Sequence, residues 1–140
     1  DQKAMIILLA DEKDILKYVS QPDPKIFDYI KGVPIPTTFV YEGGTGLANN
    51  VIQNDGSVAI RITNGPFCKK LINAFGKPIV STSANISGAP TPSSFDAIAP
   101  EVLEGVDYIV PLTTNTDIQN NQPSKVVRID TKDQIQILRQ

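Results

Sequence analysis

The residues best suited to chemistry lie in one run, 81–90, which reads Ser-Thr-Ser-Ala-Asn-Ile-Ser-Gly-Ala-Pro. The segment before it, 77–80, predicts a buried strand, because β-branched residues favour strands. We expect this strand to be central in the sheet, with its end facing Arg61 on the neighbouring strand. Hydroxyl and amide groups therefore follow the end of a strand, and ligands of open α/β sheets usually bind at that edge. Ser83 and Asn85 could bind the oxygens and amines of a small molecule there. Alternatively, they form only the local turns that end many strands.

Two cationic side chains are further candidates for ligand binding. Arg61 lies inside an otherwise apolar strand, and a guanidinium is costly to bury without an anion. Either a carboxylate ligand or a protein partner faces it, or Arg61 points outward from a half-exposed sheet. Lys3 precedes an apolar strand and could reach a phosphate, although a solvated lysine is the commoner alternative. The chain has no histidine, which excludes Ser-His-Asp catalysis and histidine zinc sites.

The composition is that of one ordinary globular domain. The chain has 140 residues, of which 41% are hydrophobic and 20% are charged, enough to bury a core. A net charge of −2 argues against a protein that mainly grips nucleic-acid phosphates. The single cysteine, Cys68, excludes an internal disulfide and fits a reducing compartment. No apolar stretch approaches the ~20 residues of a membrane span.

Strands and helices interleave along the chain. Apolar runs predict strands at 4–10, 37–41, 57–62, 77–83, 107–112, 124–129 and 135–138. Helical spacing predicts helices at 11–19, 25–31, 66–75 and from about 94. Asp11 is the expected N-cap of the first helix, and Gly76 the stop of the third. A polar stretch at 113–123 reads as a mobile loop. This alternation predicts an α/β domain with a mixed sheet.

The segment 77–90 resembles the signature of the YrdC domain, the threonylcarbamoyl-AMP synthase family. Its Ser-Ala-Asn-x-Ser-Gly run is specific. Neighbouring segments follow in the family's order, resembling its Pro-x-Thr-Phe, Val-Ala-Val-Arg, Ser-Thr-Val-Val and Ile-Leu-Arg strands at 36–39, 58–61, 124–127 and 137–139. The resemblance covers all 140 residues and implies a YrdC-like twisted mixed β-sheet with flanking helices.

The resemblance also implies an activity. The family is a nucleotidyltransferase that makes threonylcarbamoyl-AMP from L-threonine, bicarbonate and ATP, releasing pyrophosphate, for the threonylcarbamoyladenosine modification of tRNA. Carried over by position, the ATP-binding residues are Lys3, Ser57, Ser83, Thr91 and Arg139. The threonine-binding residues are Arg61, Ser81 and Ser124, and Ser83 and Asn85 form the Ser-x-Asn motif. Arg61 could clamp a carboxylate bidentately, and Mg²⁺ is expected to accompany ATP. No catalytic base and no protein-bound metal are assigned.

Two motifs of the family are missing from this chain. Family members carry an upstream Pro-Thr-Asp-Thr-x-Tyr-Gly-Leu segment and a Lys-x-Arg motif, and Lys3 matches a lysine shortly after the latter. We therefore expect a single domain over residues 1–140 that lacks the family's N-terminal third and is inactive alone.

The expected setting is the cytoplasm, without membrane contact. Expected partners are the proteins that later transfer the threonylcarbamoyl group. Because the chain is acidic, direct tRNA binding is expected to be weak or absent. Two alternatives stay open. One is a non-catalytic YrdC-like protein that binds nucleotide or RNA. The other is a YrdC module of a larger carbamoyl-transfer protein, such as a hydrogenase maturation factor.

Overall fold

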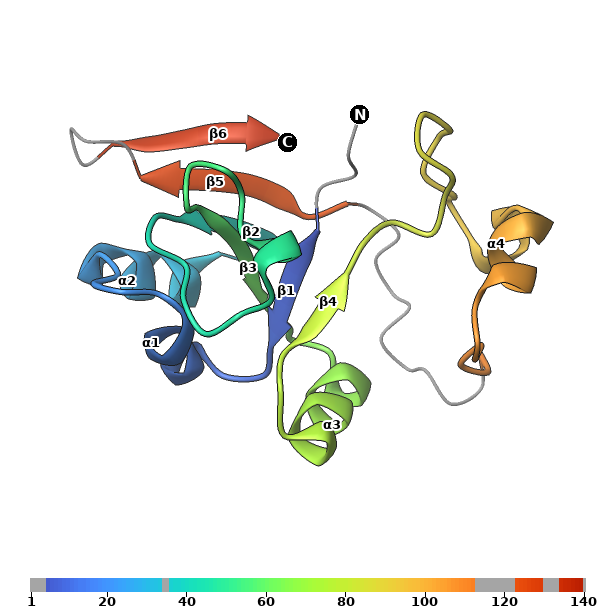
Figure 1. Ribbon diagram of the computed structural model, residues 1–140, viewed down its shortest axis with the longest axis horizontal. Coiled ribbons are helices and arrows are strands. Elements are labelled where there is room, and N and C mark those ends of the chain that lie inside the picture. The colour runs from blue at the N-terminus through green and yellow to red at the C-terminus, as the bar shows by residue number, and fades with distance from the viewer. Residues whose placement is uncertain (1–4, 34–35, 113–122, 130–133, 140) are drawn as a thin grey trace.

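A mixed β-sheet forms the centre of the molecule. The computed structural model describes residues 5–33, 36–112, 123–129 and 134–139. Within these ranges the sheet has six strands in the order β4-β1-β3-β2-β5-β6 (Figure 1). β1 pairs with β3, and β2 with β5, in parallel, whereas the other neighbours are antiparallel. The predicted α/β class with a mixed sheet is confirmed. The strands are β1 (Ile6–Leu9), β2 (Thr37–Tyr41), β3 (Val58–Ile62), β4 (Ile79–Ser81), β5 (Lys125–Ile129) and β6 (Ile135–Arg139).

Two short helices cover one face of this sheet. They are α1 (Ile15–Tyr18), which follows a 3-10 turn at Glu12–Asp14, and α2 (Pro24–Gly32). Each helical segment starts at an aspartate that accepts a backbone N–H at 2.9 Å, Asp11 from Lys13 and Asp23 from Lys25. The predicted cap at Asp11 is thereby confirmed. No helix in the described ranges is long and apolar enough to cross a bilayer.

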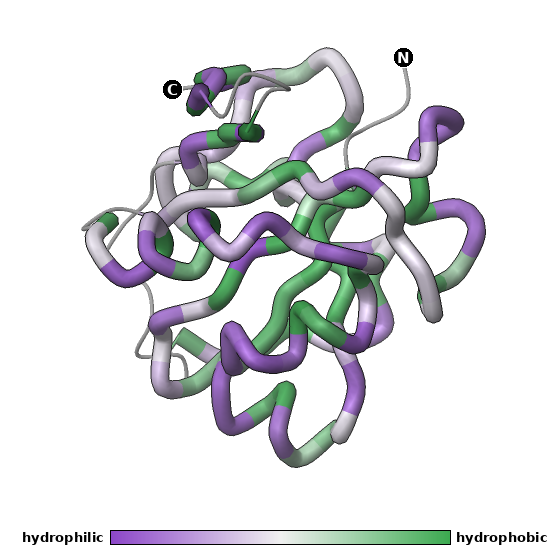
Figure 2. Tube along the Cα trace, turned by 90° about the vertical axis from the view of Figure 1, so that its left-hand side faces the viewer, coloured by the Kyte–Doolittle hydropathy of each residue, from purple (hydrophilic) through white to green (hydrophobic). Residues whose placement is uncertain are grey.

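The main core lies between these helices and the sheet. Alternate strand residues point toward the helices, because successive strand side chains face opposite sides. Figure 2 shows the hydrophobic colour along the central strands and the hydrophilic colour on outer turns. The most buried members of this core are Ile7, Leu9, Ile15, Phe39, Val58, Ile60 and Val127.

The second face of the sheet is covered only in part. A smaller cluster joins Leu8 and Ala10 of the β1 segment to Ile72 of α3 (Pro66–Phe75). This helix lies below β1 and β4 (Figure 1), and no described helix covers β3, β2 and β5 on the same side. We call this uncovered surface the open face. It is made by Ala59, Arg61, Thr38, Val40, Val126 and Arg128.

Three predictions about the elements need correction. The strand predicted at 77–83 is short, and it is an edge strand rather than a central one. It pairs only with β1, so Val80 stays 51% exposed. The strand predicted at 107–112 is wrong, because this apolar segment has no strand beside it to pair with. The helix predicted from about 94 is interrupted before Pro100, since proline donates no N–H within a helix.

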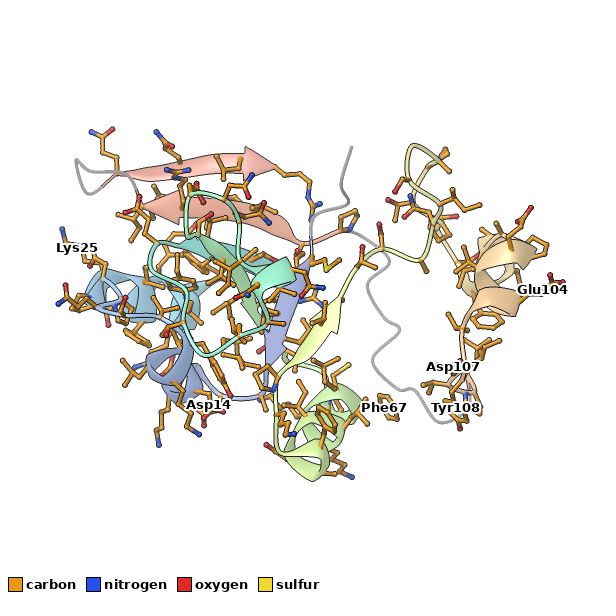
Figure 3. The ribbon with its side chains drawn as sticks, in the orientation of Figure 1. Asp14, Lys25, Phe67, Glu104, Asp107 and Tyr108 are labelled. Atoms are coloured by element: carbon orange, nitrogen blue, oxygen red, sulfur yellow. The ribbon has the colours of Figure 1, made fainter. Side chains whose placement is uncertain are left out.

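The helix predicted at 11–19 is divided into the 3-10 turn and the four-residue α1, whereas two other elements agree fully with the prediction. The strand at 37–41 and the helix at 66–75 have the predicted bounds. Gly76 ends α3 in the left-handed conformation, with φ of 74°. Most of the predicted loop at 113–123 lies outside the described residues. The segment with α4 (Pro100–Gly105) lies to one side of the sheet, beyond β4, as the positions of Glu104, Asp107 and Tyr108 in Figure 3 show.

Candidate functional site

A row of cross-strand neighbours places two arginines on the open face. Leu8 of β1 is paired with Arg61 of β3, and extending the β2–β3 register sets Arg61 opposite Thr38. Thr38 is paired with Val126 of β5, which is paired with Arg139 of β6. Because paired residues lie on the same side of a sheet, one face carries a guanidinium at each end of this row. The two backbones are three strand spacings apart, about 14 Å.

A cavity of about 620 Å³ opens on this face. Its floor is formed by alternate residues of the strands, and one wall by the loop at 50–54. The lining includes both hydroxyl and apolar groups, as small-molecule sites usually do. The lining includes the hydroxyl residues Thr38 and Ser57 and the cationic residues Arg128 and Arg139.

Part-buried hydrogen bonds anchor the arginine at the β6 end of the row. The guanidinium of Arg139 donates to the backbone carbonyl of Ser124, from Nε at 3.2 Å and from Nη2 at 2.8 Å. Nη2 also lies 3.4 Å from the hydroxyl of Ser124. That hydroxyl is 2.7 Å from the hydroxyl of Thr38, and both residues are buried. Arg139 is therefore fixed on its Ser124 side, while Nη1 makes no hydrogen bond within the described ranges.

The other arginine lacks an anionic partner. No carboxylate of the described residues forms an ion pair with Arg61 or Arg139. Burial lowers the pKa of the Arg61 guanidinium, and the charge of Arg139 lowers it further, while Cys68 acts in the opposite direction. Both effects disfavour the charged form, so a bound anion would relieve them. The open face is chemically suited to an anionic ligand.

Ser57 lies at the start of β3, where it is buried in the cavity wall. Its backbone N–H donates to the carboxylate of Asp55 at 2.9 Å. Hydrogen bonds from the hydroxyl and the backbone of Ser57 hold the pKa of Asp55 below its ordinary value. The hydroxyl therefore already has an acceptor, and a ligand would share or replace that contact.

The residues after β4 are arranged differently. Ser81 is the cross-strand partner of Ile6, which lines the cavity, so Ser81 lies on the cavity side at the edge of the sheet. Beyond it the chain turns away from the sheet (Figure 1). The amide of Asn85 donates within its own loop, to the carbonyls of Ile86 at 3.1 Å and Ala89 at 2.7 Å. Ser83 and Thr91 are exposed.

The structure thus gathers part of the predicted site. It brings Arg61, Ser124 and Arg139 to one face, with Ser57 in the wall and Ser81 at the margin. Of the predicted residues, only Ser57 and Arg139 line the cavity itself. Lys3 lies outside the described residues, and the others do not line the cavity, namely Arg61, Ser81, Ser83, Asn85, Thr91 and Ser124. β1 lies between β4 and β3, the strand that carries Arg61. The expectation that these two strands are direct neighbours is therefore wrong.

Thr38 was not singled out by the sequence. A threonine between Thr37 and Phe39 reads as an ordinary strand former, because β-branched residues favour strands. The alternation of side chains along the strand could have indicated its importance. Thr38 falls on the strand face opposite Phe39, where a polar side chain is expected to contact water or a partner. In the structure it is completely buried instead.

The comparisons with known proteins point to one family. A family model for Sua5, YciO and YrdC, described as telomere recombination, matches residues 1–140. The threonylcarbamoyl-AMP synthase of Vibrio parahaemolyticus serotype O3:K6 is 30% identical over 142 residues, covering 99% of this chain and 74% of that protein.

Solved structures have the same fold. The crystal structure of E. coli YciO is similar with a TM-score of 0.70 and 21% identity, over 96% of this chain and 64% of that one. The structure of P. abyssi Sua5 complexed with L-threonine gives a TM-score of 0.69 and 22% identity, over 98% of this chain and 39% of that one. The chain therefore spans only part of each of these proteins.

Proposed function

Because the chain belongs to the Sua5/YciO/YrdC family, we propose that it serves the formation of threonylcarbamoyl-AMP from L-threonine, bicarbonate and ATP. Pyrophosphate is the second product, and the adenylate is used to modify tRNA. The observation that carries this proposal is that Arg61 and Arg139, at the two ends of the row on the open face, have no acidic partner among the described residues. Both substrates bring an anion, a carboxylate in threonine and a triphosphate in ATP.

Each arginine has a proposed ligand. Arg61 binds the carboxylate of threonine, since a planar guanidinium matches a carboxylate with two parallel hydrogen bonds. Ser81 contributes a hydroxyl from the neighbouring edge of the sheet. Arg139 binds a phosphate of ATP with the donors that Ser124 leaves unused. A solved Sua5 that holds L-threonine supports the choice of the amino acid.

The order of these residues across the sheet fits the reaction. The residues proposed to bind ATP lie on both sides of Arg61, with Arg139 on β6 and Ser83 and Thr91 beyond β4. In the reaction, the threonine amine first attacks bicarbonate and water leaves, which gives a carbamate. A carbamate oxygen then attacks the α-phosphorus, and the bond to the β-phosphate oxygen breaks to release pyrophosphate. The α-phosphorus lies between the adenosine and the departing pyrophosphate, so contacts on both of its sides are expected.

The side chains of this protein are proposed to accelerate the reaction by orienting the substrates and by stabilising charge. We find no general base in the cavity lining, so the rate gain is proposed to come from orientation and from neutralisation of the developing charge. Among the described residues no group of three or more His, Cys, Asp or Glu side chains could hold a metal. We therefore propose that Mg²⁺ enters with the phosphates of ATP rather than in a protein site.

The remaining assignments are proposals of the same kind. Lys3 and Ser57 would complete the ATP contacts. The setting would be the cytoplasm, the product would pass to threonylcarbamoyl-transfer proteins, and tRNA itself would bind weakly or not at all.

The test is pyrophosphate release by the full-length protein. Release from ATP is measured with threonine and bicarbonate together and with each omitted in turn. The proposal expects release only when both are present. Binding of ATP without release under any of these conditions would favour the non-catalytic binding protein instead.

A further inference from the structure

We propose that Arg128 is a third cationic residue of the open face and binds the β- and γ-phosphates of ATP, the part that leaves as pyrophosphate. This role deepens the proposed function and rests on it. The carry-over from the family gives Arg128 no role. Its place in the sheet is what points to one.

Strand register places Arg128 on the open face. Arg128 of β5 is paired with Val40 of β2, which is paired with Ala59 of β3. These three residues form a second row on the open face, beside the row that carries Arg61 and Arg139. Arg128 also lines the cavity of about 620 Å³. A third guanidinium is therefore within reach of a ligand in this cavity.

Arg128 lies between the two predicted ATP-binding residues that line the same cavity. Ser57 lies at the start of β3 and Arg139 on β6, and β5 is placed between these two strands in the sheet. The backbones of Arg128 and Arg139 are roughly 8 Å apart, one strand spacing and two residues along the strand. Two arginine side chains can span this separation to reach one phosphate chain. A triphosphate that contacts both Ser57 and Arg139 therefore passes Arg128.

The distance from Arg61 indicates which phosphates Arg128 binds. In the proposed reaction, the α-phosphorus is attacked by the carbamate of the threonine that Arg61 holds. The backbone of Arg128 is two strand spacings and two residues along the strand from that of Arg61, roughly 12 Å. Arg128 also lines a second cavity, of about 340 Å³, at the ends of β2 and β5. It thus lies at the rim of the site, where the phosphates remote from the reacting atom are expected.

The alternative role for Arg128 is an ion pair with nearby carboxylates. Its Nη2 lies 4.0 Å from Oε1 of Glu42, a long contact between side chains that are 39% and 86% exposed. Exposed pairs of this kind contribute little to stability, because water screens them. The pKa of Asp55 is lowered mainly by hydrogen bonds from Ser57 and to a smaller extent by the charge of Arg128. A weak and exposed pair can open when ATP binds, since the guanidinium fork matches phosphate oxygens bidentately.

The experiment compares Arg128→Gln with Lys125→Gln. Glutamine keeps part of the side-chain stem and removes the charge. Lys125 is the matched control, because it lies on the same strand but on the opposite face and does not line the cavity. Binding of ATP, AMP and inorganic pyrophosphate to the full-length protein is measured by calorimetry with Mg²⁺, without threonine or bicarbonate.

The expected losses depend on the phosphates that each ligand carries. Arg128→Gln should weaken the binding of ATP and of pyrophosphate about tenfold, the effect of one charge-assisted contact. It should change AMP binding less than about twofold, because AMP lacks the β- and γ-phosphates. Lys125→Gln should leave all three affinities within about twofold of the wild type.

Glu42→Gln separates ligand binding from the ion pair. If Arg128 acts only through Glu42, removal of either partner should have the same effect. The binding role predicts instead that Glu42→Gln leaves ATP affinity unchanged or raises it up to about threefold, because the guanidinium loses a competing anion. Both variants should unfold within about 3 °C of the wild type, since the pair is exposed.

The outcomes are distinct. An unchanged ATP affinity in Arg128→Gln, an equal loss for AMP, or the same loss in Glu42→Gln would overturn the role of Arg128. A wild type that binds ATP but releases no pyrophosphate with threonine and bicarbonate refutes only the proposed function, since the binding measurements do not depend on turnover. A wild type that does not bind ATP would refute both.

Discussion

Replacing Arg61 with alanine tests the central assignment of the site. The structure leaves the Arg61 guanidinium without an ion pair among the described residues, and burial together with Arg139 lowers its pKa. If its anion is the carboxylate of threonine, Arg61→Ala removes two charge-assisted hydrogen bonds to that ligand. Their joint contribution is roughly 2–3 kcal/mol, which raises the KM for threonine roughly 30- to 150-fold.

The same variant should have little effect on the other substrate and on folding. Arg139 keeps its anchor on Ser124, so the KM for ATP is expected to change less than about threefold. No described carboxylate loses a partner, so the midpoint of thermal unfolding should stay the same or rise slightly. Steady-state pyrophosphate release at varied threonine and at varied ATP measures both constants.

Two further variants sharpen this test. Arg61→Lys keeps the charge and loses the planar fork, so an intermediate rise of about tenfold in the KM for threonine is expected. Lys17→Ala removes the same charge from α1, on the covered side of the sheet, and should change neither KM. Equal losses for both substrates in Arg61→Ala, or an unchanged KM for threonine, would refute the assignment of Arg61 to the threonine carboxylate.

Three predictions concern stability. The pKa of Asp55 is lowered chiefly by a hydrogen bond from the Ser57 hydroxyl. The ionised carboxylate therefore stabilises the fold above its ordinary pKa of 3.8, and this stabilisation is lost as the pH falls through the lower pKa of the folded state. Thermal midpoints of Asp55→Asn should therefore lie slightly below those of the wild type at pH 7 and converge with them as the pH falls below the ordinary value, and parallel curves would contradict this. Tyr41 has a buried hydroxyl without a partner in the described ranges, and burial raises its pKa, so Tyr41→Phe should be neutral or stabilise by about 1 kcal/mol in urea unfolding. Ile15→Ala should lose roughly 2–5 kcal/mol in the same assay, whereas the neighbouring Leu16→Ala, 64% exposed, should lose no more than about 0.5; similar losses would show that the core is placed wrongly.

The sequence predicted helix boundaries well where individual residues such as proline and glycine determine them. Helix α3 has its predicted bounds, because Pro66 is favourable at a helix start and Gly76 can adopt the left-handed conformation that ends one. The burial of its face was less predictable. Ile72 is buried, but Phe75 is 59% exposed, since the sheet beside α3 ends at β4.

The position of a strand within the sheet is a different kind of property. The segment 77–83 was expected at the centre because it is rich in β-branched residues, yet β4 forms the edge. Composition describes how well a segment fits a pleated surface and does not identify its neighbours. For the same reason the hydroxyl run after Ser81 was expected to face Arg61, although β1 lies between their strands.

The candidate site was predicted where a residue broke its local pattern. Arg61 was found because a guanidinium in an apolar strand requires an explanation, and no carboxylate among the described residues forms an ion pair with it. Thr38 was missed because nothing about it conflicts with a strand. Its importance depends on contact with Ser124, 86 residues further along the chain, and such a contact has no signal in either segment alone.

At Arg61 and Arg139, the stability of the fold and the binding of an anion make opposite demands on the neighbouring residues. A carboxylate placed between Arg61 and Arg139 would relieve the burial of one charge and the repulsion between the two. It would also occupy the place of an anionic substrate and repel its charge. The chain as a whole is acidic, with a net charge of −2, so acidic residues are not scarce in it. Their absence beside both guanidiniums, among the described residues, is therefore better explained by binding than by stability.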